Sequence, residues 1–209
     1  MSSHPESRPR SARDFYRTPV EAVIPLVQEI HDRWGNLSEP VILDPGAGDG
    51  NITRAIRTVW PKAHLVAVEI DPQHEAALRA AGASEVVIGD FLTTPLDGFD
   101  LIIGNPPFSL AVEFIDRSRE QLNPFGVMTM LLQLNFLGSE ERVDWWQARP
   151  QQAQRTLSPR PSFDGVGADS VDYAWQVWDE QRQYVWAPFG HYHWRESRAY
   201  AKRHAGAVA

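Results

Sequence analysis

The stretch Val41-Ile42-Leu43-Asp44-Pro45-Gly46-Ala47-Gly48-Asp49-Gly50 decides the fold class of this 209-residue chain. Its first residues form a short apolar run, which is typical of a buried strand, and the glycines that follow permit a tight turn. A helix is expected directly after it, over residues 51–59. Backbone amides in such a strand–turn–helix unit can approach a ligand closely, so the turn is a candidate binding element.

The same alternation of strand and helix continues on both sides of the turn. A helix is expected from residue 20 to about residue 34, introduced by Thr18-Pro19 and Glu21 in the pattern of a capping box. Further strands are expected at 65–69, 86–88, 100–103 and 127–132, and further helices at 73–81 and 111–122. Two more strands, 154–157 and 173–178, extend the sheet. We therefore expect a single α/β domain with a doubly wound, mostly parallel, seven-stranded sheet.

The composition excludes several classes of protein. Lys and Arg number 20 against 27 Asp and Glu, so the chain is no uniformly basic nucleic-acid coat, and a local patch must meet any polyanion. It has no cysteine, which excludes disulfides, thiolate metal sites and thiol nucleophiles. The apolar run 126–138 is short and interrupted, and no signal-peptide core is visible, so we expect a cytoplasmic protein without membrane attachment.

The composition also suggests boundaries within the chain. Residues 1–13 are expected to be a flexible tail and residues 195–209 a basic C-terminal tail, on either side of a domain at 14–194. Six of the eight tryptophans follow Phe136, so elements that face the substrate are expected mainly in 136–194. Most of these tryptophans are nevertheless expected to pack in the core, because large aromatic side chains are usually buried.

Acidic residues follow the first three strands in a pattern that fits a nucleoside. Asp44 and Asp49 flank the glycine turn, where they would repel a pyrophosphate and attract a positively charged ligand. Glu69 could accept the hydroxyls of a ribose, and Asp90 an adenine amino group with Phe91 beside the ring. These groups together fit S-adenosylmethionine. The alternative is an ordinary strand-to-helix turn with surface acids, because short motifs arise by chance.

The tetrapeptide Asn105-Pro106-Pro107-Phe108 follows the fourth strand and carries the candidate catalytic chemistry. Its prolines make the loop rigid and remove two N–H donors, so the loop presents the carbonyl of Pro106 and the side-chain oxygen of Asn105. Two fixed acceptors suit a planar NH2 group that gains positive charge as it attacks. Phe108 could stack on a flat substrate. The alternative is an ordinary rigid turn.

Several segments of the chain resemble class I S-adenosylmethionine-dependent methyltransferases. The segments that carry the resemblance are Asp14–Pro19, Asp44–Gly50, Glu69, Asp90, Asn105–Phe108, 158–163 and 173–179. Within that class the chain looks like the small phage-type adenine-N6 DNA methyltransferases with an Asn-Pro-Pro-aromatic motif. The resemblance implies a Rossmann-like fold, S-adenosylmethionine as cofactor, no metal, and methylation of the 6-amino group of adenine in DNA.

The resulting expectations for individual residues are as follows. Catalysis is assigned to Asn105, Pro106, Pro107 and Phe108. Cofactor binding is assigned to Tyr16, Thr18, Pro19, Asp44, Gly46, Ala47, Gly48, Glu69, Ile70, Asp90, Phe91 and Asn105. A base flipped out of a duplex is stabilised by stacking on aromatic rings, so substrate binding is assigned to Phe108, Arg160, Phe163 and Trp175.

Two departures from the family pattern keep alternatives open. The chain has no room for a large target-recognition domain, and its acidic charge is unusual for an enzyme that gains affinity from phosphate contacts. The same loop chemistry would suit an amino group of an RNA base or a glutamine amide in a protein. A non-catalytic cofactor-binding subunit is a further alternative, and a protein partner could supply affinity or specificity. The resemblance implies a bacterial protein or a phage protein made in a bacterial host.

Overall fold

A mixed sheet forms the centre of the protein in a computed structural model that describes residues 17–35, 37, 39–163, 169–179, 181 and 184–197. The strands are β1 (Val41–Pro45), β2 (His64–Glu69), β3 (Glu85–Ile88), β4 (Phe99–Gly104), β5 (Leu122–Gln133), β6 (Ala153–Ser158), β7 (Tyr173–Trp178) and β8 (Phe189–His193). The helices are α1 (Val20–Trp34), α2 (Asn51–Val59), α3 (Glu75–Ala80), α4 (Ala111–Gln121) and α5 (Val143–Ala148). Short 3-10 turns are η1 (Pro72–His74), η2 (Phe108–Leu110), η3 (Leu134–Gly138), η4 (Glu140–Arg142) and η5 (Trp194–Ser197).

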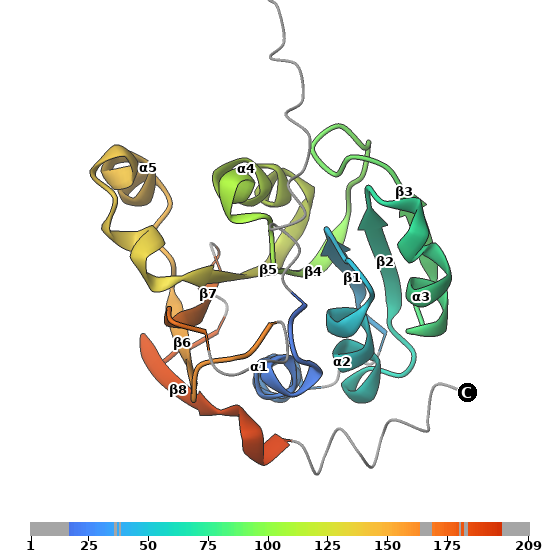
Figure 1. Cartoon of the computed structure of the whole chain (residues 1–209), viewed down its shortest axis with the longest axis horizontal. Coiled ribbons are helices and arrows are strands. Elements are labelled where there is room, and N and C mark those ends of the chain that lie inside the picture. Colours follow the sequence, from blue (N-terminus) through green and yellow to red (C-terminus); the bar gives the residue numbers. More distant parts are fainter. Residues whose placement is uncertain are drawn as a thin grey trace, which may run out of the picture.

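The sheet order is β3-β2-β1-β4-β5-β7-β6-β8 (Figure 1). The first five strands run parallel, β7 runs antiparallel to β5 and β6, and β8 is parallel to β6. The doubly wound, mostly parallel fold is therefore confirmed, but the sheet has eight strands rather than the seven expected. The eighth strand, β8, lies at the sheet edge with alternate residues exposed, so it lacks the apolar run by which the buried strands were found.

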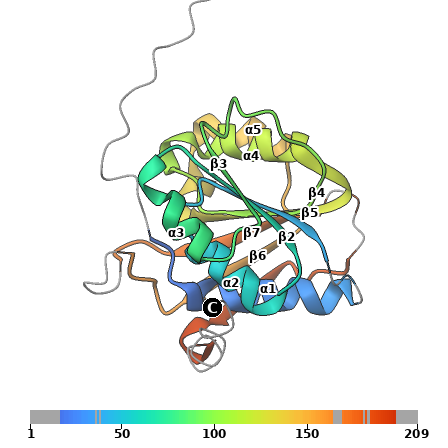
Figure 2. The ribbon, with the colours of Figure 1, turned by 90° about the vertical axis from the view of Figure 1, so that its right-hand side faces the viewer.

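Helices cover both faces of this sheet, as the two perpendicular views show: α1 and α2 lie on one face and α4 and α5 on the other (Figures 1 and 2). Strands buried on both faces need apolar residues, which is why β1 begins with the apolar run Val41-Ile42-Leu43. Its Ile42 belongs to the core beneath α1 and α2, whereas the adjacent Leu43 belongs to the core beneath α4. Among the helices of the described residues, none is both long and apolar enough to cross a membrane.

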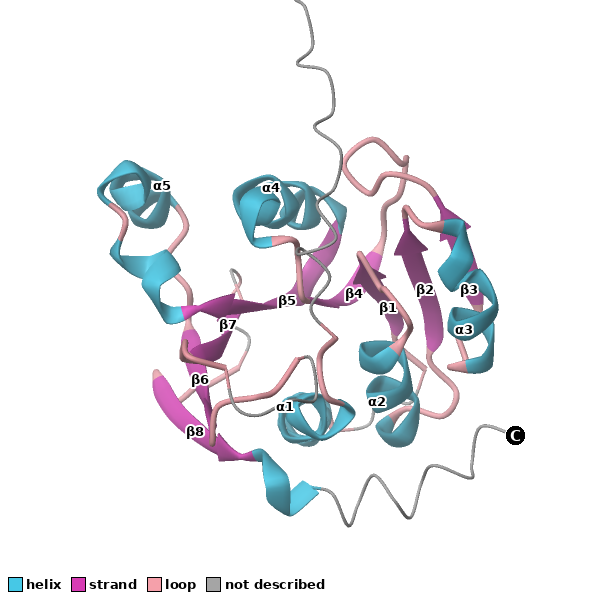
Figure 3. Ribbon diagram, in the orientation of Figure 1, coloured by secondary structure: helices cyan, strands magenta, loops and turns pink. Residues whose placement is uncertain are grey.

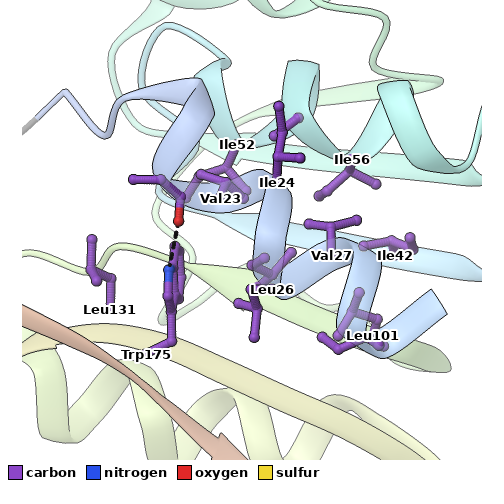
Figure 4. Close-up of a cluster of buried hydrophobic side chains, with 14 of the residues drawn as sticks. Val23, Ile24, Leu26, Val27, Ile42, Ile52, Ile56, Leu101, Leu131 and Trp175 are labelled. Carbon is purple, nitrogen blue, oxygen red and sulfur yellow. Dashed lines mark hydrogen bonds between the residues drawn. The ribbon is translucent and has the colours of Figure 1, made fainter. Parts of the chain in front are cut away.

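Trp175 lies inside the core between α1 and the sheet, together with Leu26, Leu101 and Leu131 (Figure 4). Its side chain is completely buried, and its indole N–H donates a hydrogen bond of 3.1 Å to the carbonyl oxygen of Ala22. The assignment of Trp175 to substrate binding is therefore wrong, because neither the ring nor its polar group is available to a base. Core packing was expected for most of the six tryptophans after Phe136. Trp175, Trp178 and Trp194 are buried, whereas Trp145, Trp146 and Trp186 are partly buried and pack against the edge of the core.

A buried ion-pair network joins α1 to the last strands of the sheet. Glu29 of α1 accepts hydrogen bonds from Arg155 of β6 at 2.6 and 2.8 Å, and from Arg33 at 2.6 Å. The hydroxyl of Tyr192 on β8 also donates to Glu29. Burial alone would raise the pKa of Glu29, but the hydrogen bonds from Arg155, Tyr192 and Arg33 outweigh it and lower the pKa to about 2. This network fixes β6 and β8 against the helix.

The secondary-structure drawing in Figure 3 shows that the strands form one continuous sheet, in agreement with a single domain. The tail expected at residues 1–13 lies outside the described residues, as do residues 198–209 of the basic C-terminal tail. The first residues of that tail belong to η5. The predicted boundary at residue 194 falls at the end of β8, which closes the described sheet.

Candidate active site

The glycine turn that follows β1 is folded back onto the end of β2. The backbone amides of Gly46 and Ala47 both donate to the carbonyl oxygen of Val68, each at 2.9 Å. Gly46 has a φ of 68°, and a side chain there would place its Cβ 3.3 Å from the ring of Phe114. Both the left-handed backbone and the close ring require glycine at this position. The turn therefore has a fixed path at the carboxyl edge of the sheet.

Glu69, at the end of β2, braces this turn directly. One carboxylate oxygen accepts the amide of Gly48 at 2.8 Å, and the other accepts the amide of Asp71 at 2.9 Å. The side chain is almost fully buried. The structure thus brings Glu69 to the glycine turn, as expected for two elements that share one edge, and adds a role that the sequence did not indicate: the carboxylate orders the turn itself.

Asp44 lies beneath the turn as a buried carboxyl group. One oxygen accepts a hydrogen bond of 2.8 Å from the hydroxyl of Thr53 on α2, and the other has no hydrogen-bond partner among the described residues. Complete burial raises the pKa of Asp44 to about 7, although the hydrogen bonds from Thr53 lower it. A buried, unpaired carboxylate oxygen is costly, so this position favours a ligand that brings a hydrogen-bond donor or a positive charge. Thr53 was missed by the sequence analysis.

The residues expected around an adenine ring differ in their exposure. Asp90 is exposed, and its carboxylate accepts the amide of Leu92 at 3.0 Å. Ile70 exposes 45% of its surface beside Glu69. Phe91 is only 2% exposed, and its ring packs on Phe114 with centroids 5.0 Å apart. The expected contact of the Phe91 side chain with an adenine ring is therefore corrected: this ring belongs to the core below α4.

The Asn105-Pro106-Pro107-Phe108 loop begins where β4 ends, next to β1. A Cβ on Gly104 would come within 3.1 Å of the Pro45 side chain, so the ends of the two strands approach closely. Asn105 is partly buried, and its side-chain NH2 donates to the hydroxyl oxygen of Thr18 at 2.9 Å. Pro106 and Pro107 are buried. The structure thus brings the candidate catalytic loop and the glycine turn to the same edge.

The segment before α1 contacts both of these loops. Its Thr18 is not the helix cap that the sequence predicted, because Pro19 occupies that position and no side chain caps the helix. Instead the Thr18 hydroxyl accepts a hydrogen bond from Asn105. The backbone carbonyl oxygen of Thr18 accepts one from the side chain of Asn51 at 2.9 Å. Arg17 forms an ion pair with Asp49, which uses the negative charge that was expected to face a ligand. Tyr16, expected at the cofactor, lies outside the described residues.

An aromatic cluster lies next to Phe108, the last residue of the candidate catalytic loop. The ring of Phe108 lies 5.9 Å from that of Tyr173, and Phe163 meets the same tyrosine edge-on at 4.7 Å. The Tyr173 hydroxyl donates to Asp169 at 2.8 Å and accepts from Gln133 at 3.2 Å. Phe108 and Phe163 are thus brought together as expected, around a buried tyrosine that the sequence analysis had placed only in a strand.

Arg160 lies in the connection between β6 and β7, which contains Phe163. It is exposed and pairs with Asp172 at 2.7 Å. Because β6 and β7 are antiparallel, this connection lies at the same edge as the end of β5. Arg160 therefore lies at the sheet edge that its assignment to substrate binding requires. The assignment itself stays a prediction.

Comparison with known proteins adds to this geometry. The family model described as "Methyltransferase small domain" matches residues 25–145, more than half of the chain. The type II methyltransferase M.CvrRI of Paramecium bursaria Chlorella virus XZ-6E is 35% identical over 80 residues, which cover 38% of this chain and 21% of that protein. The dimethyladenosine transferase of Saccharomyces cerevisiae is 33% identical over 120 residues, which cover 54% of this chain and 37% of that protein. The chain therefore spans well under half the length of these curated relatives.

A solved structure shows the same fold at low sequence identity. It is described as a class I S-adenosylmethionine-dependent methyltransferase from Listeria monocytogenes and superimposes with a TM-score of 0.68 at 15% identity. The superposition covers 90% of this chain and 70% of that one. The shared architecture therefore extends over most of the chain rather than over the glycine turn alone.

Proposed function

Because the chain belongs to the methyltransferase small domain family, we propose that it transfers a methyl group from S-adenosylmethionine to the 6-amino group of adenine in DNA. The observation that carries the proposal is the juxtaposition of two loops at one sheet edge. Gly104 packs against Pro45, so the Asn105 loop stands beside the glycine turn. A donor held at one loop and an acceptor held at the other would be neighbours, which is what direct transfer between them needs.

The residues at the glycine turn fit the proposed donor. The unpaired buried oxygen of Asp44 suits a cationic or hydrogen-bond-donating part of a ligand. Glu69 ends β2, and the exposed Asp90 follows β3, the strand that runs parallel beside it. Glu69 would hold a ribose there, and Asp90 an adenine amino group. S-Adenosylmethionine, when bound, supplies an electrophilic methyl group on a sulfonium.

The residues of the Asn105 loop would act on the acceptor. The side-chain oxygen of Asn105 and the carbonyl oxygen of Pro106 would accept hydrogen bonds from a planar NH2 group and so fix its position. As that nitrogen attacks, it gains positive charge, which the two oxygens stabilise; such stabilisation is often the largest single catalytic effect. The amine can lose its proton to water after the transfer, so the loop needs no histidine base. Phe108, supported by Tyr173, would contact the ring of the base.

Adenine in RNA is the second candidate acceptor, favoured by the similarity to dimethyladenosine transferases over more than half of this chain. The test is to incubate the protein with isotope-labelled S-adenosylmethionine and matched pools of DNA, RNA and protein, and to analyse the digested products by mass spectrometry. We expect labelled N6-methyldeoxyadenosine from the DNA pool. Label only in RNA, or only in glutamine of the protein pool, would replace DNA as the acceptor. No S-adenosylhomocysteine from any pool would indicate a non-catalytic subunit.

We expect the affinity for S-adenosylmethionine to rise with pH across neutrality. Burial raises the pKa of Asp44 to about 7 in the free protein, so much of this carboxyl group is protonated below that pH. A cationic ligand favours the carboxylate form, so binding releases this proton. The affinity is therefore expected to fall by about 10-fold when the pH is lowered from 8 to 6. Isothermal titration calorimetry in buffers of different ionisation enthalpy measures both the affinity and the proton release.

The controls for this experiment are two Asp→Asn variants. Asp44→Asn is expected to remove the pH dependence together with part of the affinity. Asp97→Asn, on the exposed connection before β4, is expected to behave like the wild type. An affinity that is constant from pH 6 to pH 8 in the wild type would contradict the proposed role of Asp44.

A further inference from the structure

The hydroxyl of Thr18 and the side-chain amide of Asn105 meet across 87 residues of sequence. The Asn105 NH2 group donates to the Thr18 hydroxyl oxygen at 2.9 Å, and Thr18 is only 4% exposed. Thr18 does not cap α1, so its hydroxyl makes no contribution to the helix end that the sequence pattern suggested. The contact with Asn105 is therefore the interaction that explains why a buried hydroxyl stands at this position.

Thr18 is itself held in place by the start of α2. Asn51 donates from its side chain to the backbone carbonyl of Thr18 at 2.9 Å, and Arg54 donates to the Asn51 side-chain oxygen at 2.7 Å. The ion pair of Arg17 with Asp49 anchors the neighbouring residue to the glycine turn. A chain of hydrogen bonds thus runs from α2, through Thr18, to the amide of Asn105.

The direction of this last hydrogen bond has a chemical consequence. A side-chain amide is planar, with two donors on the nitrogen and an acceptor on the oxygen. The nitrogen and the oxygen lie on opposite sides of the Cβ–Cγ bond axis. A hydrogen bond from the Asn105 nitrogen to Thr18 therefore turns the oxygen away from Thr18. The substrate NH2 group donates hydrogen bonds, so it needs the Asn105 oxygen as their acceptor. An amide nitrogen in the position of that oxygen would place two hydrogen-bond donors against each other.

From this arrangement we infer that Thr18 is a positioning residue for methyl transfer, which orients the Asn105 amide so that its oxygen meets the acceptor amino group. The inference rests on the proposed function of the Asn105 loop, and it replaces the assignment of Thr18 to cofactor binding. In this role Thr18 acts through Asn105 rather than directly on either reactant. The hydrogen-bond chain also ties this orientation to α2, the helix that follows the glycine turn.

The kinetic test uses three substitutions. Thr18→Val keeps the shape of the side chain but removes the acceptor, and it is expected to lower kcat by about 10- to 100-fold with an unchanged Kd for S-adenosylmethionine. Thr18→Ser retains the hydroxyl and is expected to recover most of the lost rate. Thr58→Val is the matched control, because Thr58 is a threonine of α2 whose hydroxyl donates to the carbonyl oxygen of Ala55 at 2.7 Å. A weaker Kd with normal kcat in Thr18→Val would return Thr18 to the cofactor site and overturn the inference.

A second readout does not depend on activity. In ¹⁵N-resolved NMR spectra, the side-chain amide of Asn105 is identified as the pair of signals that disappears in Asn105→Asp. Thr18→Val is expected to shift these signals and to speed their hydrogen exchange, whereas Thr58→Val leaves them unchanged. Unchanged Asn105 signals in Thr18→Val would overturn the inference even if the wild type methylates none of the pools. If the wild type is inactive but Thr18→Val shifts the Asn105 signals, the proposed function is overturned, whereas the hydrogen bond between Thr18 and Asn105 is supported.

Discussion

Replacing Asn105 with alanine is expected to reduce methyl transfer by about 100- to 1,000-fold, the usual effect of removing one preorganised group that stabilises developing charge. The side-chain oxygen is one of two acceptors for the substrate amino group, and Pro106 supplies the other from its backbone. Because Glu69 holds the amide of Gly48 and Asp44 is held by Thr53, neither through Asn105, affinity for S-adenosylmethionine is expected to change by less than a few fold. Calorimetry measures the affinity, and release of labelled product measures the rate.

Asn123→Ala is the matched control for this variant. Asn123 donates to Asp100 at 2.8 Å near the start of β5, at the opposite end of that strand from Gln133. Its loss is expected to leave kcat close to that of the wild type. Full activity in Asn105→Ala would refute the catalytic assignment, and loss of cofactor binding alone would move Asn105 to the donor site.

Glu29→Gln is expected to lower the free energy of unfolding by about 3–5 kcal/mol at neutral pH, because it removes the counter-charge of a buried arginine. Arg155 is 4% exposed and donates to both Glu29 carboxylate oxygens. A glutamine has one acceptor oxygen instead of two and carries no charge, so it leaves the Arg155 guanidinium without a counter-charge among α1, β6 and β8. Chemical denaturation at pH 7 measures the loss.

The pH dependence gives this prediction a second test. The pKa of Glu29 is lowered in the folded state, from 4.5 to about 2, so its contribution is fully present above pH 4.5. As pH falls, the unfolded chain takes up the proton first, and the contribution is lost progressively towards pH 2. The difference in stability between wild type and Glu29→Gln should therefore shrink over that range. A constant difference would contradict the assigned ion pair.

Glu75→Gln serves as the control for the ion-pair substitution. Glu75 pairs with Arg79 one helical turn away, and both side chains are exposed. Exposed pairs of this kind contribute little to stability, so no more than about 0.5 kcal/mol is expected here. Equal losses in both variants would show that charge, rather than burial of the network, determines the effect.

The sequence predicted those parts of the fold that depend on local pattern. Helix α2 was expected at 51–59 and occupies Asn51–Val59. The glycine turn marks the start of this helix, because Gly50 is its N-terminal cap. Strand β8 was missed, because Phe189, His191 and His193 face solvent at an edge and leave no apolar run. Edge strands carry less of the periodic signal that buried strands must carry.

The candidate site was predictable to the extent that parallel strands end at one edge. That rule brings Glu69 to the glycine turn and Asn105 beside it. It could not reveal that Thr18 meets Asn105 or that Gln133 meets Tyr173, because these contacts depend on the path of a loop and on strand register. It also could not show on which side of β7 the Trp175 ring would lie, and this ring proved to be covered by α1.

The order of the strands has a consequence for engineering. Under the proposed function, strands β1–β4 would carry the methyl donor. The elements after Gln133, at the antiparallel end of the sheet, would select the acceptor. A chimera that exchanges only that end would still fail, because α1 supplies Glu29 to Arg155 and the Ala22 carbonyl to Trp175. The transferable module is thus split in the gene, with its first helix upstream of the donor half, and a graft has to carry both pieces together.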